Sequence, residues 1–213
     1  MSSRSLGEII LSTCSLLSVV RRYISIVRTN ACAVTAGEGR GMLRILHPSL
    51  ATMNHSCVVN TRVFKRADHV VCVRAQTPIL KGQEIFNKYT SFFAGQIERT
   101  ELIQDNWNFC CECPRCRDPS DLGSNFDTLI CTKCKGSMFP DGNDKHSPWV
   151  CGKCGDSLPR EKVRNMEDQL SKKIANSARD LKKMEAFFIE NLNSFHSNHH
   201  QMVNIKVSFT ICL

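Results

Sequence analysis

The sequence predicts a mixed fold of strands and helices with a zinc-bound segment, and three observations predict it. Two strand-like runs, TRVFKR and HVVCVRA, follow one another in the first half of the chain. Seven of the 13 cysteines lie close together between residues 111 and 154. After Pro159, apolar residues recur at spacings of three, four and seven, which is typical of amphipathic helices.

The chain is large enough for one ordinary domain and a small second one. It has 213 residues, of which 42% are apolar, so a core is feasible and global disorder is not expected. The net charge of +8 could suggest an acidic partner, but the basic residues are spread along the chain without a block of five or more. Direct nucleic-acid binding is therefore not expected.

The apolar start of the chain is not expected to be a secretion signal or a membrane anchor. Residues 1–29 have helical or mixed character, and no apolar run in the chain approaches the roughly 20 residues that span a bilayer. Ser and Thr interrupt the first run, and Arg21 and Arg22 follow it at once. Clustered cysteines without a secretion signal indicate zinc rather than disulfides. The cytoplasm and the nucleus both suit reduced thiols.

The remaining elements can be placed in order along the chain. We expect a flexible turn at TAGEGRG, another at Gly82 in LKGQE, and extended structure again in IFNKY. AGQIERTELIQDNW predicts a helix that leads into the first cysteines. Residues 111–155 show little periodicity, so this segment needs metal to hold a fold. The C-terminal pattern predicts one amphipathic helix or a pair with a break near ANSARD.

The clearest metal motif is a repeated Cys-x-x-Cys pair. Cys131 and Cys134 form the first pair, and Cys151 and Cys154 form the second, 16 residues later. Two residues between thiols let both sulfurs reach one ion about 2.3 Å away, and two pairs close a tetrahedral site. A closed four-thiolate site leaves no position for water, so we expect a structural zinc. Trp149, beside the second pair, is expected to cover the metal.

A second set of cysteines is one ligand short of a tetrahedral zinc site. Cys111, Cys113 and Cys116 supply three thiolates. Cys110 is adjacent, although consecutive residues rarely reach the same ion comfortably. Cys57, which lies 54 residues upstream of Cys111 in the segment NHSCVVN, is the other candidate. The spacing alone does not decide which thiol completes the site.

Three segments in order, NHSCVVN, LKGQEIFNKY and NWNFCCECPRCRDP, resemble the C-terminal half of a SET domain and its post-SET zinc segment. The cysteine pattern resembles the SET-and-MYND type of protein lysine methyltransferase. The later Cys pairs and HSNHHQM look most like the arthropod-specific members of that group. The resemblance runs from about Val20 to about Lys206. It implies an α+β architecture: small β-sheets with a pseudoknot, a zinc-bound post-SET segment and a C-terminal α-helical tail.

The resemblance divides the chain into three parts. It implies a partial SET domain at residues 1–109, a post-SET zinc-binding region at 110–160 and a helical tail at 161–213. Complete family members open with a Gly-rich cofactor segment and a MYND zinc finger, neither of which is found before Val20. We therefore expect a fragment, a splice form or an incomplete product in which methyl transfer is weak or lost, with exposed sheet edges.

The resemblance also assigns roles to single residues. It implies that Asn54 and His55 hold the adenosyl part of S-adenosylmethionine and that Asn30 is a further cofactor-binding residue. It places Phe109 against the adenine ring and makes Tyr89 the active-site tyrosine. In such enzymes a neutral lysine amine attacks the sulfonium methyl group in line, so the protein must align the two and desolvate the amine. The implied substrate is a protein lysine, on a histone or another protein.

The resemblance further implies that Cys57 is the missing zinc ligand. Two zinc ions are then expected, both as scaffold, because the charge that drives the reaction is already on the cofactor. The implied ligands are Cys57, Cys111, Cys113 and Cys116 for one ion, and Cys131, Cys134, Cys151 and Cys154 for the other.

Some positions depart from the family pattern or fit it without an assigned chemistry. Val59 stands where Pro is usual, which is expected to loosen a turn. Trp107 stands where a second tyrosine is usual and is expected to reshape the lysine channel. His196, His199 and His200 fit the tail motif and are expected to be structural. The competing interpretation is a non-catalytic zinc-dependent module that binds protein partners through the post-SET region and the helical tail. Cofactor affinity separates the two interpretations.

Overall fold

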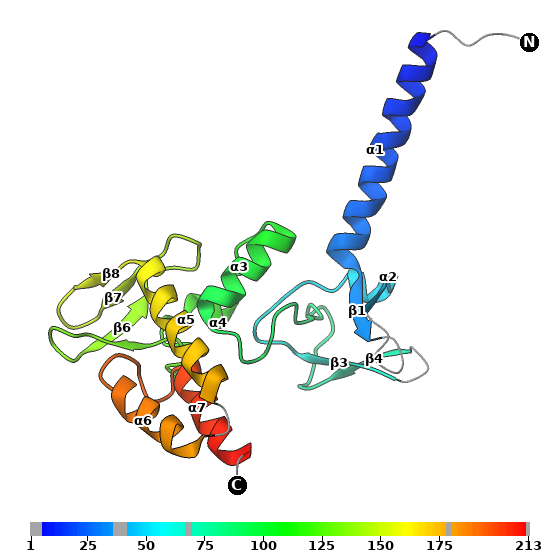
Figure 1. Ribbon diagram of the computed structural model, residues 1–213. Coiled ribbons are helices and arrows are strands. Elements are labelled where there is room, and N and C mark those ends of the chain that lie inside the picture. The colour runs from blue at the N-terminus through cyan, green and yellow to red at the C-terminus, as the bar shows by residue number, and fades with distance from the viewer. Residues whose placement is uncertain (1–5, 36–41, 67–69, 178–179, 212–213) are drawn as a thin grey trace, which may run out of the picture. The chain divides into compact units, whose positions relative to one another are not determined.

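The computed structural model describes residues 6–35, 42–66, 70–177 and 180–211 (Figure 1). The chain forms two compact units that divide between Asn54 and His55. Each unit combines helices with small antiparallel sheets, so the predicted mixture of helices and small sheets is confirmed. No helix in the described ranges is both long and apolar enough to cross a membrane. The expected turn at TAGEGRG lies almost wholly outside the described residues.

The first unit pairs one long helix with a short hairpin. Its elements are α1 (Leu6–Asn30), β1 (Cys32–Thr35), β2 (Met42–Ile45) and α2 (Pro48–Ala51). The two strands are antiparallel, with Cys32 opposite Ile45. Arg44 on β2 donates a hydrogen bond to the carbonyl oxygen of Arg28, 3.2 Å away, which ties the hairpin to the end of α1. Proline at the first position of α2 suits a helix start because its fixed φ and missing N–H cost nothing there.

The second unit begins with a hairpin and continues into helix and sheet. Its elements are β3 (Thr61–Lys65), β4 (Val71–Ala75), α3 (Gln96–Trp107), α4 (Pro114–Arg117), β5 (Leu129–Ile130), β6 (Ser137–Pro140), β7 (Trp149–Cys151), β8 (Ser157–Leu158), α5 (Arg160–Ser177), α6 (Leu181–Asn191) and α7 (His200–Ile211). Strands β5 to β8 form one antiparallel sheet in sequence order. Helices α5, α6 and α7 pack side by side (Figure 1).

One large core holds the four-stranded sheet against the three C-terminal helices. Its fully buried side chains come from both layers and include aromatic, aliphatic and thiol groups. The buried members are Ile97, Leu129, Cys131, Met138, Trp149, Cys151, Val163, Leu170, Met184, Phe195, Met202 and Ile205. Burial of this apolar surface is the main stabilising term for the second unit.

Several elements match the sequence analysis and others differ from it. The β3–β4 hairpin, helix α3 and the turn at Gly82, whose φ is +89°, are confirmed. IFNKY forms only one isolated bridge, between His55 and Asn87, rather than a strand. The C-terminal pattern gives the expected pair, α5 and α6, but also a third helix, α7. Helix α7 lies within the expected helical tail, but the periodic pattern did not predict it because its apolar residues are not confined to one face.

Candidate functional site

The segment NHSCVVN is held against residues 87–89. A single parallel bridge joins His55 to Asn87, and the backbone N–H of Ser56 donates to the carbonyl oxygen of Asn87 at 3.2 Å. The backbone N–H of Tyr89 donates to Nδ1 of His55 at 3.1 Å. Nδ1 of His55 therefore accepts a hydrogen bond, and Nε2 lies 3.4 Å from the sulfur of Cys57. Both ring nitrogens of His55 are thus engaged within the protein, which leaves the ring face and the main chain for other contacts.

Aromatic rings gather around this segment. The His55 and Tyr89 ring centroids are 5.2 Å apart, and those of Tyr89 and Trp107 are 4.6 Å apart. Phe109 lies 6.3 Å from His55, centroid to centroid. Burial raises the pKa of Tyr89, so its hydroxyl stays protonated at neutral pH. Trp107, which the sequence analysis placed in a lysine channel, is therefore a ring neighbour of the predicted active-site tyrosine.

A cavity of about 710 Å³ opens beside these rings. Its lining includes His55, Asn60, Phe86 and Phe109. Asn60 fixes one wall, because its side-chain amide donates to the carbonyl oxygen of Glu84 at 2.8 Å and its Oδ1 accepts from the N–H of Phe86 at 2.9 Å. The sequence analysis gave Asn60 no role, although an amide at a strand start is a common signal for backbone pairing. A mostly apolar cavity with a few polar groups suits a small organic ligand.

Two predicted cofactor residues lie in the first unit. Asn30 is the last residue of α1, and its side-chain amide donates to the carbonyl oxygen of Ile26 at 3.0 Å. Asn54 is the last residue of that unit. His55 and Phe109 belong to the second unit. That all four residues hold one cofactor remains a prediction.

Four sulfurs converge in what we call the first cysteine group: Cys57, Cys111, Cys113 and Cys116. All four lie within 4.8 Å of one another, and the Cys57 and Cys116 sulfurs are 3.5 Å apart. Ligands 2.3 Å from a tetrahedral zinc lie about 3.8 Å apart, so the group fits the ion. Cys110 is exposed and accepts a hydrogen bond from Gln104 at 2.8 Å. The thiol that completes the set is therefore Cys57.

The crowding of these thiols shows why a cation suits the first cysteine group. Hydrogen bonds from Cys113 and Cys116 lower the pKa of Cys111. The hydrogen bond between Cys57 and Cys111 raises the pKa of Cys57. Four neighbouring thiols cannot all ionise unless a positive charge lies among them. A zinc ion would supply that charge and release the protons.

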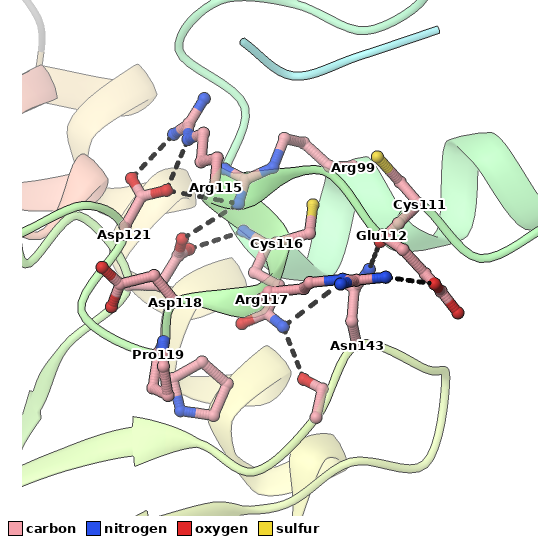
Figure 2. Close-up of a pocket in the computed structure, with 14 residues that line it drawn as sticks. Arg99, Cys111, Glu112, Arg115, Cys116, Arg117, Asp118, Pro119, Asp121 and Asn143 are labelled. Carbon is pink, nitrogen blue, oxygen red and sulfur yellow. Dashed lines mark hydrogen bonds and ion pairs between the residues drawn. The ribbon is translucent and has the colours of Figure 1, made fainter.

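Charged side chains surround a second cavity, of about 390 Å³, next to the first cysteine group (Figure 2). Arg115 forms a two-pronged ion pair with Asp121, one arm of which is a 2.8 Å hydrogen bond. Arg99 is buried 3.5 Å from Asp127 and 3.7 Å from Asp121. Asn143, on the loop between β6 and β7, donates to the carbonyl oxygen of Cys111. The loop between β6 and β7 therefore contacts the first cysteine group directly.

The second cysteine group comprises Cys131, Cys134, Cys151 and Cys154. The Cys131–Cys154 and Cys134–Cys151 sulfur distances are 3.7 and 3.5 Å, again close to those of a zinc tetrahedron. The two pairs have equivalent turns, since the N–H of Lys135 donates to the Cys131 carbonyl and that of Gly155 to the Cys151 carbonyl. Both residues have positive φ, 59° and 71°.

Trp149 lies in the same core as Cys131 and Cys151, fully buried. Its indole N–H donates to the carbonyl oxygen of Asp127 at 2.8 Å. The ring therefore packs within the core beside the second cysteine group and anchors the segment before β5. That it covers the metal remains a prediction.

Comparison with known proteins connects this site to one family. Residues 9–90 match the family model of the SET domain. The match begins before Val20, where the resemblance was expected to start. The chain is 30% identical over 152 residues to SET domain-containing protein SmydA-8, isoform A, of Drosophila melanogaster. That match covers 69% of this chain and 33% of the relative. It is 28% identical over 148 residues to histone-lysine N-methyltransferase ASHR1 of Arabidopsis thaliana, covering 66% of this chain and 30% of the relative.

A shorter match links the chain to a human enzyme. The chain is 34% identical over 71 residues to N-lysine methyltransferase SMYD2 of Homo sapiens, covering 33% of this chain and 16% of that protein. The chain thus spans about a third or less of the length of these relatives. The resemblance inferred from the sequence is confirmed at the level of the SET domain and the SET-and-MYND type.

Proposed function

Because this chain is related to the SET-and-MYND-type proteins, we propose that it serves the S-adenosylmethionine-dependent methylation of protein lysines. One observation carries the proposal: His55, Tyr89 and Phe109, from three separate segments, come together beside a cavity of about 710 Å³. A packing role alone would explain each residue singly, but not a cavity of ligand size lined by His55 and Phe109, with Tyr89 next to His55. A histone or another protein supplies the lysine, and the cytoplasm and the nucleus both remain compatible compartments.

The residues of the cavity divide the work of binding and orientation. S-adenosylmethionine, when bound, supplies an electrophilic methyl group on a sulfonium. Phe109 offers a partly exposed ring face for the adenine, and the main chain of His55 supplies polar contacts. That Asn54, in the first unit, also contacts the cofactor remains a prediction. Tyr89 stays protonated because of its raised pKa, so its hydroxyl can orient a lysine amine. Trp107 packs on Tyr89 and narrows the approach, which excludes water from the amine.

We assign both cysteine groups to zinc, as structural sites. Each group has four thiols at the spacing of a tetrahedral ion, which leaves no position for a reacting water. The first cysteine group includes Cys57, which lies next to His55. A zinc ion bound to this group would therefore fix the wall of the cavity. The metal would then fix the shape of the cavity and take no part in the methyl transfer.

The test is calorimetric titration of the full, zinc-loaded chain with S-adenosylmethionine. We expect micromolar binding that is lost in Phe109→Ala and in the double variant Asn54→Ala/His55→Ala. Phe93→Ala is the matched control, because Phe93 is an exposed aromatic that does not line this cavity. Absence of binding by a folded chain that holds zinc in both cysteine groups would refute the proposal.

The second candidate is a non-catalytic zinc-dependent module that binds protein partners. The observation that favours it is the large core, which unites the second cysteine group with α5, α6 and α7 and includes no residue of the 710 Å³ cavity. A chain that folds, binds zinc and ignores S-adenosylmethionine would support this function. We propose the helical tail as the surface such partners would contact.

A further inference from the structure

Three buried side chains meet between α5 and the start of α7. Glu167 lies on α5, and His199 and His200 lie where α7 begins. His199 is fully buried, and Glu167 and His200 are each 7% exposed. Within the described part of the chain, one ligand atom from each of these side chains lies within 4.8 Å of the others. His196, from the same sequence motif, is not part of this group.

The distances within the group are unusual for hydrogen bonds. Oε1 of Glu167 is 3.3 Å from Nε2 of His199 and 3.7 Å from Nε2 of His200. Hydrogen bonds between nitrogen and oxygen are normally 2.7–3.2 Å long. Among the described residues, neither Oε1 of Glu167 nor Nε2 of His199 has a hydrogen-bond partner. A buried polar atom without a partner destabilises a folded protein, so such a pair calls for an explanation.

The same distances suit a bound metal ion. Nitrogen and oxygen ligands lie about 2.0–2.1 Å from zinc, so two of them on one tetrahedral ion are about 3.3–3.4 Å apart. The Glu167–His199 distance of 3.3 Å matches this spacing, and the Glu167–His200 distance exceeds it by a few tenths of an ångström. The two cysteine groups also deviate from the zinc geometry by only a few tenths of an ångström. Their sulfurs are 3.5–3.7 Å apart, where a zinc tetrahedron requires about 3.8 Å.

The surroundings of His200 favour a ligand role. Its Nδ1 lies 3.3 Å from the carbonyl oxygen of Phe126 and 3.7 Å from a carboxylate oxygen of Asp127. A proton on Nδ1 leaves the lone pair on Nε2, which faces Glu167. Metal-binding histidines commonly have a carbonyl or carboxylate at the second nitrogen. Gly95 makes this position possible, since a Cβ there would clash with Cε1 of His200.

We propose that Glu167, His199 and His200 bind a divalent transition-metal ion, with Zn²⁺ as the first candidate. Two imidazoles and one carboxylate are a ligand set that zinc accepts, and they leave one position for a water molecule. The ion gives the unpartnered oxygen and nitrogen a shared partner and joins α5 to α7. The alternative is a metal-free pair in which Nε2–H of His199 donates to Glu167. The backbone N–H of Gln201 lies 3.3 Å from Nδ1 of His199, a contact that ligation would give up.

The first measurement is the zinc content of the full chain, expressed with added zinc and dialysed exhaustively against metal-free buffer. We expect three zinc ions per chain, one for each group. Glu167→Gln and His200→Asn should each lower the value by one. His196→Asn, the matched control from the same motif, should leave it unchanged. A zinc content that Glu167→Gln and His200→Asn do not change would overturn the proposal.

The second measurement needs no variant, so a destabilised protein cannot leave the question open. X-ray absorption at the zinc edge of the unaltered chain resolves the ligand shell. We expect nitrogen or oxygen at about 2.0–2.1 Å in addition to sulfur at about 2.3 Å. A shell of sulfur alone would overturn the proposal. This outcome does not depend on cofactor binding, so the proposed methyl transfer and the third metal site stand or fall separately.

Discussion

The two cysteine groups have the same ligands but very different surroundings. Cys57 and Cys116 of the first group are 59 residues apart, whereas Cys131 and Cys154 of the second are 23 apart. By the logarithmic dependence of loop entropy, this difference in length amounts to only about 1 kcal/mol. Among the described residues, the hydrophobic cluster of the first group includes one other buried apolar residue, Ile103. The second group shares a core of twelve buried residues.

This difference shows what each metal would do. Around the second cysteine group, an apolar core and the metal would stabilise the same sheet and helices. Loss of the metal would therefore expose the core, and disruption of the core would expose the metal site. Around the first group there is little core, so the metal itself holds NHSCVVN against the segment after α3. Stability should depend more on the second group, and ligand binding more on the first.

The largest effect should follow from Cys131→Ser. Cys131 is fully buried in the large core, and structural zinc contributes roughly 10–16 kcal/mol of apparent binding free energy in zinc-finger peptides. We expect loss of one zinc and unfolding of the sheet and the C-terminal helices. Circular dichroism and thermal unfolding measure this. Cys72→Ser, a half-buried strand cysteine outside both groups, is the control. A variant with an unchanged melting temperature would contradict the comparison.

Cys57→Ser should have a smaller effect on stability but abolish ligand binding. The variant removes one thiol of the first cysteine group, and with it the sulfur that lies next to Nε2 of His55. The large core is untouched. We expect one zinc fewer than in the unchanged chain, retained helix content and no binding of S-adenosylmethionine. Cys110→Ser, which alters an exposed adjacent thiol, should retain both properties. Global unfolding by Cys57→Ser would show that the two groups are not separable.

The same difference explains how far the sequence could predict the site. The second cysteine group could be predicted from spacing, because both pairs are local and symmetric. Cys57 could be assigned only through the family resemblance, because its partners are distant in sequence. The strands of the four-stranded sheet were missed because they are two to four residues long. Glu167 gave no signal at all, since a single acidic residue on an amphipathic helix normally faces solvent.

Arg99→Met should destabilise the chain next, through the charges between the two groups. The buried Arg99 neutralises Asp121 and Asp127, and its removal leaves two buried carboxylates without that cation. Breaking a buried ion pair in this way costs about 3–5 kcal/mol. Arg117→Met is the control, because the Arg117–Glu112 pair is exposed and such pairs contribute about 0–1 kcal/mol. Urea unfolding of both variants measures the difference, and equal midpoints would refute it.

Asn143→Ala tests whether the sheet supports the first cysteine group. Its amide donates to the Cys111 carbonyl, and its Oδ1 accepts from Thr100 at 3.2 Å. Loss of these bonds should cost about 1–3 kcal/mol and speed zinc release from the first group alone. Transfer of zinc to a coloured chelator measures the rates. Asn106→Ala, which removes an exposed bond to Leu102, should change neither rate. Equal acceleration of both groups would exclude a specific support.

The smallest effect should be a pH dependence of folding stability. A lysine near the first cysteine group should produce it, and a lysine near the second should not. Desolvation lowers the pKa of Lys88 from 10.5 to about 8, and its Nζ lies over the ring of Phe92 without a hydrogen-bond partner among the described residues. Between pH 8 and 10.5 the unfolded chain therefore binds more protons, so stability rises with pH. Lys88→Met should remove this rise.

Lys133, beside the second group, has its pKa raised by its hydrogen bond to Asp156. A raised lysine pKa gives a contribution that is complete below 10.5 and is lost only as the pH rises through the folded-state value. Lys133→Met should therefore leave the slope between pH 8 and 10 unchanged. Urea midpoints at pH 7.5, 8.5 and 9.5 with excess zinc compare the three proteins. Parallel curves for Lys88→Met and the unchanged chain would show that Lys88 is solvated, and the two cysteine groups would then not differ in this respect.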